Sequence, residues 1–213
     1  MRLVSLNVGG PRELEWRGET VRTSIFKSPV AGRVRVRAQN IDGDRQSDLS
    51  VHGGVDKAVY AYPSEHYGFW RADLGLDALP WGAFGENLTT EGLLEREVAI
   101  GDHLHVGSAE LVVTQPRMPC FKLGIRFGRP DMVKRFKTAG WTGFYLAVVR
   151  EGELAAGDSI ALVPSRDERI SVADAFRAAT DRRADPELVR RISALPALSA
   201  SWREDFRARL AGD

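Results

Sequence analysis

The chain has 213 residues, of which 43% are hydrophobic and 28% are charged, proportions typical of a globular protein. Its 30 lysines and arginines nearly balance its 29 aspartates and glutamates, so the overall charge gives no indication of binding to nucleic acid or to a membrane surface. The single cysteine excludes a disulfide within the chain and any zinc site built from several thiolates.

The beginning of the chain has no recognisable targeting segment. Residues 1–10 lack the apolar core and the small-residue cleavage site of a secretory signal. No stretch approaches the roughly 20 apolar residues that a membrane-spanning helix needs. We therefore expect a cytoplasmic protein.

The first third of the chain predicts short strands. Apolar and β-branched runs predict them at 3–8, 21–26, 33–38 and 58–62. Strict alternation in the third run places Val34, Val36 and Ala38 on one side and three arginines on the other. The arginines could form an anion-binding stripe, although such a pattern is more often the solvated face of a half-buried strand. The polar, glycine-rich segment 42–57 is too long for a simple turn, which favours a functional loop.

A helix and a second pair of strands follow. Pro63 suits the first position of a helix, and Tyr67, Trp70 and Leu74 recur at helical spacing as its buried face. A second polar glycine loop covers 82–90. Strands are expected at 98–106 and 110–114. In the first of these two strands, two histidines two residues apart point the same way, as metal ligands can, but a polar strand face explains them as well.

The only cysteine, Cys120, follows a strand-like run and lies in a predicted loop held by two prolines. Arg117 precedes it by three residues and Lys122 follows it by two. Nearby cations favour the thiolate, which attacks electrophiles and binds soft metals. A lone cysteine can equally behave as a small buried hydrophobe, so this stretch alone leaves both interpretations open.

The remainder predicts a change of architecture near Pro164. Before it, a short helix at 131–138 and strands at 142–150 and 159–163 complete a mainly antiparallel barrel or sandwich, which we assign to residues 1–164. Residues 165–213 have a helical period. Ser171 with Asp174 forms a predicted capping box, Asp185-Pro186-Glu187 starts a second helix, and Ser201 with Glu204 can cap a third. We expect this small domain of three helices to pack against the barrel.

Four motifs in a fixed order now support a family resemblance. They are Lys27-Ser28-Pro29-Val30; the loop with Asp44-Arg45-Gln46-Ser47-Asp48, His52-Gly53-Gly54 and Asp56-Lys57-Ala58-Val59; Gly85-Glu86-Asn87-Leu88; and Arg117 with Pro119-Cys120. In this combination, and with the helical tail, essentially the whole chain resembles the MOSC domain family and most of all its YiiM-like branch.

The resemblance implies a MOSC-type β-barrel that binds the molybdenum cofactor (molybdopterin), a pterin with a dithiolene and a phosphate. It also implies that Cys120 is a ligand to the metal, and thiolate suits a metal already held by sulfur. Cations, hydroxyls and backbone amides suit the phosphate, and an amide suits a pterin edge. The candidate cofactor-binding residues are Lys27, Ser28, Gly53, Gly54, Asn87 and Arg117.

The activity implied by the resemblance is that of a molybdenum-dependent oxidoreductase. Family members reduce N-hydroxylated compounds, such as hydroxylaminopurines or amidoximes. The candidate catalytic residues are Cys120, His52 as a proton donor and Asp48 as the group that orients His52 or the substrate. A purely structural role for His52 is the alternative. Electron-transfer domains fused to some members are absent from this sequence, so we expect a separate electron-donor reductase protein.

Two other functions stay open. Cys120 could carry a persulfide and pass sulfur to another metalloenzyme, or the chain could be a non-catalytic cofactor-binding module. The three-helix segment could dock the electron donor, cover the substrate mouth or form a homodimer interface.

Overall fold

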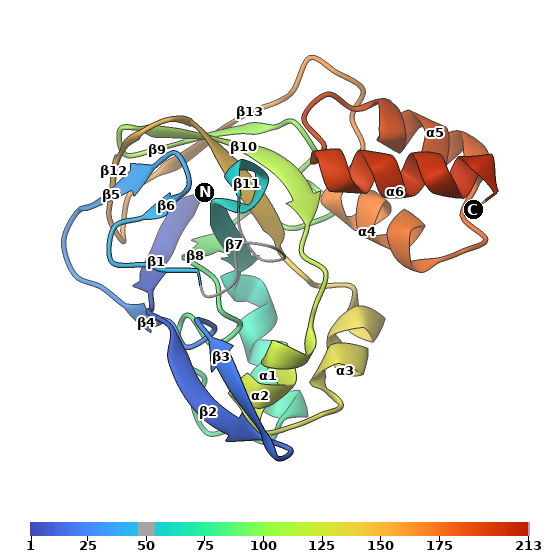
Figure 1. Ribbon diagram of the computed structural model, residues 1–213. Helices are drawn as coiled ribbons and strands as arrows, with labels where there is room; N and C mark the ends of the chain where they lie inside the picture. Colours follow the sequence, from blue (N-terminus) through green and yellow to red (C-terminus); the bar gives the residue numbers. More distant parts are fainter. Residues whose placement is uncertain (47–53, 213) are drawn as a thin grey trace.

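The computed structural model describes residues 1–46 and 54–212, and its central element is an eight-stranded sheet (Figure 1). The order of strands is β13-β9-β10-β11-β7-β8-β1-β4, and β7 pairs with β8 in parallel. The strands are β1 (Arg2–Val8), β4 (Ser28–Pro29), β7 (Val59–Pro63), β8 (Leu88–Glu91), β9 (His103–Val106), β10 (Ala109–Pro116), β11 (Phe144–Arg150) and β13 (Ile160–Val163).

The sheet closes because β1 uses both of its edges. One edge pairs with β8. On the other edge, the end of β1 pairs with β4, while its beginning meets the segment that leads into β13. There, Leu3 N donates to Asp158 O at 2.9 Å and Ile160 N donates to Met1 O at 3.0 Å. Closure removes exposed strand edges and encloses an apolar core, as expected for the predicted barrel.

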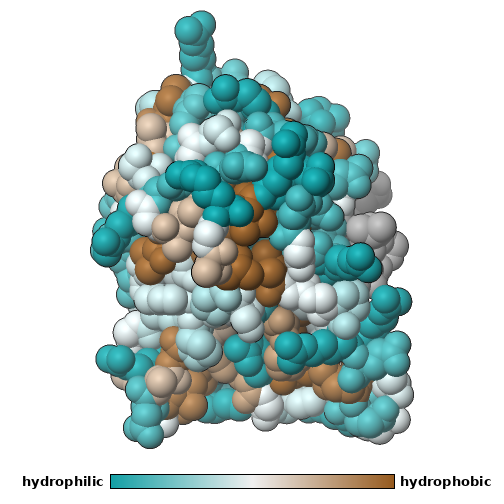
Figure 2. Space-filling view, turned by 90° about the vertical axis from the view of Figure 1, so that its left-hand side faces the viewer, coloured by the Kyte–Doolittle hydropathy of each residue, from teal (hydrophilic) through white to brown (hydrophobic). Residues whose placement is uncertain are grey.

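Two smaller sheets flank the barrel. One is the hairpin of β2 (Arg12–Trp16) and β3 (Glu19–Thr23); the other joins β5 (Val34–Arg37), β6 (Asn40–Ile41) and β12 (Gly152–Leu154). Only part of the predicted strand at 21–26 is therefore a strand, and β2 was not predicted. The face on the left of Figure 1 is largely hydrophilic, with apolar patches near its middle and lower edge (Figure 2).

The alternating strand β5 has a solvated face. Val36 is fully buried and Val34 is partly buried, whereas Ala38 is exposed because it lies in the turn after the strand. The arginines are exposed and pair with carboxylates, among them Arg33 with Asp158 at 3.0 Å. The stripe is therefore a set of surface ion pairs.

Helices cover one end of the barrel around a second, aromatic-rich core. They are the short 3₁₀ turn η2 (Ser64–His66) with α1 (Tyr67–Asp73), α2 (Phe121–Phe127) and α3 (Met132–Ala139), whereas the 3₁₀ turn η1 (Val55–Lys57) packs against β10 and β11. Tyr67 and Trp70 of α1 are buried, as their spacing predicted, and Trp70 stacks on Phe136 of α3 with ring centroids 5.4 Å apart. Helix α2 was not predicted.

The C-terminal helices form the predicted three-helix unit. They are α4 (Val172–Thr180), α5 (Pro186–Ala194) and α6 (Ala200–Ala211), and they lie together beside the barrel (Figure 1). Ser171 caps α4 by accepting from Asp174 N at 3.0 Å, as predicted. The third cap was wrong, because α6 begins one residue after Ser199. Apolar residues of α4 and α5, such as Val172 and Ile192, share one core with the barrel.

Two other sequence expectations are settled by the described residues. The expected strand at 98–106 begins only at His103. Within residues 1–46 and 54–212, none of the helices has the length and apolar character needed to cross a membrane.

Candidate active-site pocket

A pocket open to solvent lies where the N-terminal segment, β7 and the Cys120 segment meet. It is lined by Thr23, Ser24, Ile25, Lys27, Asp44, Gln46, Lys57, Tyr60, Gly85, Asn87, Arg117, Met118, Cys120, Lys122 and Tyr145. Residues of all four sequence motifs therefore share one cavity, together with Tyr145 of β11.

Cys120 lies at the start of helix α2 and is a free, partly exposed cysteine. Strand β10 ends at Pro116, and the extended residues that follow carry the thiol into the pocket beside Arg117 and Lys122. Helix α2 holds this position because Leu123 and Ile125 are buried on its inner face. Cys120 therefore has the accessibility that a metal ligand or a nucleophile needs.

Arg117 is a buried cation with no carboxylate partner among the described residues. Only 5% of it is exposed. Its guanidinium donates to Tyr60 Oη at 3.3 Å and lies 4.8 Å from the Tyr60 ring centroid and 5.5 Å from that of Phe136. Burial acts to lower its pKa, but the neighbouring tyrosines and the thiol outweigh burial and raise it, so Arg117 remains charged. A buried cation held by aromatic rings is suited to an anionic ligand.

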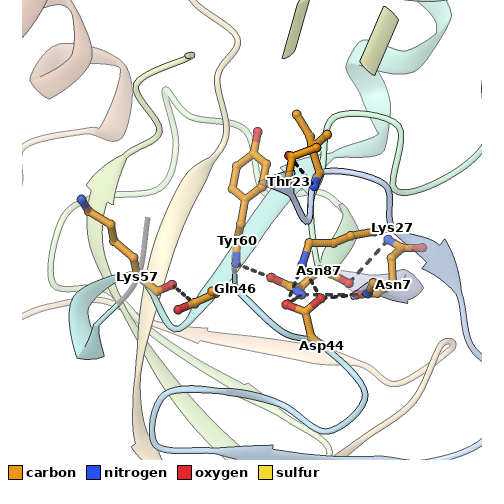
Figure 3. Close-up of polar contacts among 10 residues, drawn as sticks. Asn7, Thr23, Lys27, Asp44, Gln46, Lys57, Tyr60 and Asn87 are labelled. Carbon is orange, nitrogen blue, oxygen red and sulfur yellow. Dashed lines mark hydrogen bonds and ion pairs between the residues drawn. The ribbon is translucent and has the colours of Figure 1, made fainter. Parts of the chain in front are cut away.

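Lys27 is also buried, but it is already paired. Its Nζ lies 2.5 Å from both carboxylate oxygens of Asp44 (Figure 3). Asp44 also accepts from Gly9 N at 2.9 Å and from Asn87 Nδ2 at 3.0 Å. Burial lowers the pKa of Lys27, while Asp44 acts to raise it. Lys27 can therefore direct only its remaining N–H toward a ligand, and Asp44 is a structural partner that the sequence analysis did not single out.

The side-chain amide of Asn87 is largely used within the protein. It donates to Asp44 and to Asn7 O, and its Oδ1 accepts from Tyr60 N at 3.1 Å (Figure 3). With both N–H groups engaged, only a lone pair of the oxygen remains for a ligand. The structure thus gives Asn87 a positioning role for Asp44 and Tyr60.

Glu86, next to Asn87, is buried and holds the glycine loop in place. Its carboxylate accepts from Gly82 N at 2.9 Å, from Phe84 N at 3.1 Å and from the Tyr67 hydroxyl. Burial raises its pKa. This residue shapes the pocket wall and does not line the cavity.

Three hydroxyl groups of the pocket were not found by the sequence analysis. Tyr60 Oη donates to Thr142 O at 2.7 Å, which fixes its ring beside Arg117. Burial raises the pKa values of Tyr60 and Tyr145, so both phenols stay protonated at neutral pH. Ser24 Oγ is buried in the pocket wall without a hydrogen-bond partner among the described residues. An unpaired buried hydroxyl costs free energy unless a ligand or water satisfies it.

The remaining sequence candidates lie elsewhere or outside the described residues. Ser28 is exposed in β4 and does not line the pocket; Ser24, four residues earlier, has that place. Gly54 precedes η1 and is not part of the lining either. Asp48, His52 and Gly53 fall outside the described residues, so their predicted roles stay predictions.

The two histidines of β9 do not form a metal site with described residues. His103 Nδ1 lies 2.8 Å from Glu110 Oε1 in a surface pair. No group of three histidine, cysteine or acidic side chains suited to a metal occurs among residues 1–46 and 54–212. Polar strand surface is therefore the better interpretation for these histidines.

Comparison with known proteins identifies the family. A family model for the MOSC domain matches residues 48–161, and a model for the YiiM-like, 3-alpha helix domain matches residues 170–213. The uncharacterized protein YflK of Bacillus subtilis is 42% identical over 204 residues, which are 96% of this chain and 92% of YflK. A Gibberella moniliformis protein named Reductase is 34% identical; the match covers 84% of this chain but 32% of that protein.

Solved structures agree with the sequence matches. The crystal structure of YiiM from Geobacillus stearothermophilus superposes with a TM-score of 0.83 at 38% identity, covering 98% of both chains. The barrel and the helical unit that follows it are thus shared over almost the whole chain. The chain belongs to the MOSC family, in the YiiM-like branch that carries a three-helix domain after the MOSC domain.

Proposed function

We propose that this protein is a molybdenum-cofactor-binding reductase of N-hydroxylated compounds, such as hydroxylaminopurines or amidoximes. The observation that carries the proposal is the placement of the only cysteine, partly exposed, in a pocket beside a buried arginine without a carboxylate partner among the described residues. This pair of groups suits a ligand with a soft metal at one point and a negative charge at another.

The chemistry of the pocket fits the molybdenum cofactor in two respects. Four cationic side chains line it, and the one carboxylate in its described lining, Asp44, is paired with Lys27. The excess of positive charge favours a phosphate-bearing ligand. The unpaired hydroxyl of Ser24 is available to a polar group of the ligand.

The residues divide into those that would hold the cofactor and those that position them. Cys120 would ligate the metal, and Arg117 with Lys122 would bind the phosphate. The Tyr145 phenol, protonated at neutral pH, would donate a hydrogen bond. Asn87 would act through the side chains that it holds in place.

The bound cofactor supplies a two-electron reduction of the N–O bond. Conversion of an N–OH compound to its amine consumes two electrons and two protons and releases water. The pocket must therefore deliver protons as well as exclude bulk solvent from the reacting bond. We keep His52 as the proposed proton donor and Asp48 as its orienting group.

The electrons require a separate reductase protein. The Gibberella relative named Reductase supports this division, because this chain matches 32% of its length and the rest of that polypeptide is additional sequence. We propose that a separate partner protein supplies the electrons here, whereas a longer polypeptide can carry the electron-donating part in the same chain.

The first test is the metal content of wild type and Cys120→Ala, both produced with added molybdate in a host that makes the cofactor. We expect about one molybdenum per wild-type chain and a loss of at least tenfold in the variant. Lys134→Ala, an exposed lysine outside the pocket, is the control and should keep its metal. Pterin fluorescence of the same samples reports the organic part of the cofactor.

Each outcome has a clear meaning. Metal in wild type and control but not in Cys120→Ala supports the ligand assignment and justifies assays with N–OH substrates. Equal metal in all three contradicts it. No molybdenum in any sample, together with cyanide-labile sulfur on Cys120, would favour the persulfide carrier instead.

A further inference from the structure

A second cleft lies where the barrel meets the three-helix unit. It is lined by η2, the loop after β8, the end of α3 and helix α4, and α3 and α4 are neighbours in Figure 1. Its volume is about 500 Å³, within the range of small-molecule sites. None of its described lining residues belongs to the active-site pocket, so the two cavities are separate.

The inner wall of this cleft contains a buried pair, His66 and Glu95. His66 Nε2 lies 2.8 Å from Glu95 Oε2, and the two side chains are 8% and 4% exposed. The other carboxylate oxygen of Glu95 accepts from Gly143 N at 2.8 Å. Both oxygens of this buried acid therefore have partners within the protein.

An aromatic surface lies next to the pair. Trp141 stacks on the His66 ring, with ring centroids 4.8 Å apart and the two planes inclined by 2°. Phe69 packs edge-on against the same indole at 4.8 Å. These contacts fix the partly buried Trp141, which lines the cleft together with Leu94 and Phe176. A fixed indole and apolar neighbours offer a rigid contact for a planar ring.

The charges left for a ligand in the cleft are positive. Arg96, Lys137 and Arg177 are exposed in its lining, and Arg177 pairs with the lining acid Asp174. Arg96 pairs with the exposed Glu97 beside it at 3.2 Å, a contact that solvent weakens. Lys137 has no ion pair with a described residue. Lys137 and Arg96 are therefore the groups that can receive a negative charge.

We propose that this cleft binds a small aromatic anion, with its ring against Trp141 and its charge toward Lys137 and Arg96. Burial of the ring removes apolar surface from water, and the cations select a negative group over a neutral or positive one. The inference does not rest on the proposed function, because Cys120 and Arg117 line the other cavity.

NMR titration of the purified full-length chain with three probes tests the proposal. The probes are indole-3-acetate, the neutral indole-3-acetamide and the cation tryptamine, which share a ring and differ in charge. We expect indole-3-acetate to bind with a Kd of about 1 mM or lower and the other two at least tenfold more weakly. The indole N–H of Trp141 reports on the cleft, and the backbone amide of Lys122 reports on the active-site pocket.

A matched pair of variants locates the charge that is recognised. Lys137→Glu should weaken the binding of indole-3-acetate at least tenfold, because a repulsive charge replaces the free cation. Lys134→Glu is the control and should bind as wild type does, since Lys134 is exposed on the same helix but does not line the cleft.

Four results would overturn the proposal. Tryptamine binding as tight as that of indole-3-acetate would refute selection for an anion. An equal loss in the Lys134→Glu control would reduce the effect to general surface charge. Shifts at Lys122 without shifts at Trp141 would place the anion in the active-site pocket. No saturable shift at Trp141 with millimolar indole-3-acetate would show that the cleft does not bind this class of compound.

Discussion

The buried ion pair of Lys27 and Asp44 allows a quantitative test of how the pocket is built. Asp44→Asn keeps the shape of the side chain but removes its charge and replaces one acceptor oxygen by an N–H donor. In the wild type these oxygens accept from Lys27 Nζ, Gly9 N and Asn87 Nδ2. The substitution leaves a buried cation without its partner and at least one donor facing another donor.

The expected loss is large because both partners are removed from solvent. The Lys27 and Asp44 side chains are 7% and 2% exposed. Breaking a buried pair from one side typically costs about 3–5 kcal/mol. For a chain of this size, that loss corresponds to a fall in Tm of roughly 6–20 °C. Asp42→Asn is the matched control, because the Arg37–Asp42 pair is about half exposed and screened by solvent, so its loss should change the stability much less.

Equilibrium urea unfolding of the cofactor-free proteins, followed by tryptophan fluorescence, measures the difference. A second variant separates charge from hydrogen bonding. Lys27→Met combined with Asp44→Asn removes the unpaired cation and should recover at least half of the loss. If Asp44→Asn costs no more than Asp42→Asn, the ion pair does not stabilise the fold and our account is wrong. If the double variant recovers nothing, the lost hydrogen bonds of Gly9 and Asn87 explain the effect.

Three further predictions concern other parts of the molecule. Arg117→Met should fold, because methionine keeps the apolar contacts of the arginine stem. The purified variant should contain at least tenfold less pterin and molybdenum than wild type, because the phosphate loses its cation. A wild-type content of both would contradict the phosphate-binding role of Arg117. Gly143→Ala should cost more than about 2 kcal/mol of unfolding free energy in urea, since its φ is 65° and an added Cβ would lie 2.3 Å from a backbone oxygen. Gly128→Ala is the control: its φ is 63°, a Cβ there meets open space, and the cost should be about 1 kcal/mol. Equal losses would refute the steric argument. Asp131 should titrate near pH 2 by NMR, because hydrogen bonds from Arg129 and Arg135 lower the pKa of its carboxyl to about 2. Its stabilising contribution is therefore present above pH 3.8 and is lost as the pH falls through about 2. A titration midpoint at the ordinary aspartate value would contradict these two ion pairs.

Several elements could be predicted because their signals are local. The alternation of β5, the buried spacing of Tyr67 and Trp70 and the cap at Ser171 all depend on neighbours within a few residues. Helix α2 escaped prediction for the opposite reason. It has seven residues, too few for intrinsic stability, and it forms because Leu123 and Ile125 are buried against the rest of the protein. The prolines before it indicated a loop and gave no sign of the helix.

The candidate site was predicted in part, and the errors have a common cause. Lys27, Asn87, Arg117 and Cys120 do share one pocket. Of the two serines near Lys27, however, the one that faces the cavity is Ser24, because β3 ends just before it. A sequence pattern gives the residue types of a loop but not the direction in which each side chain points.

The sequence by itself determined most of the longer strands, the three C-terminal helices and the presence of one thiol near cations, since these depend on composition and short-range spacing. Only the tertiary structure decided how the charges are used. It brings Asp44 to Lys27 across 17 positions and Tyr60 to Arg117 across 57, so one cation is neutralised while the other keeps its charge for a ligand. The sequence does not distinguish Lys27 from Arg117 as a free cation. They differ in the fold because the energy between two charges depends on their distance in space, not on their separation in the chain.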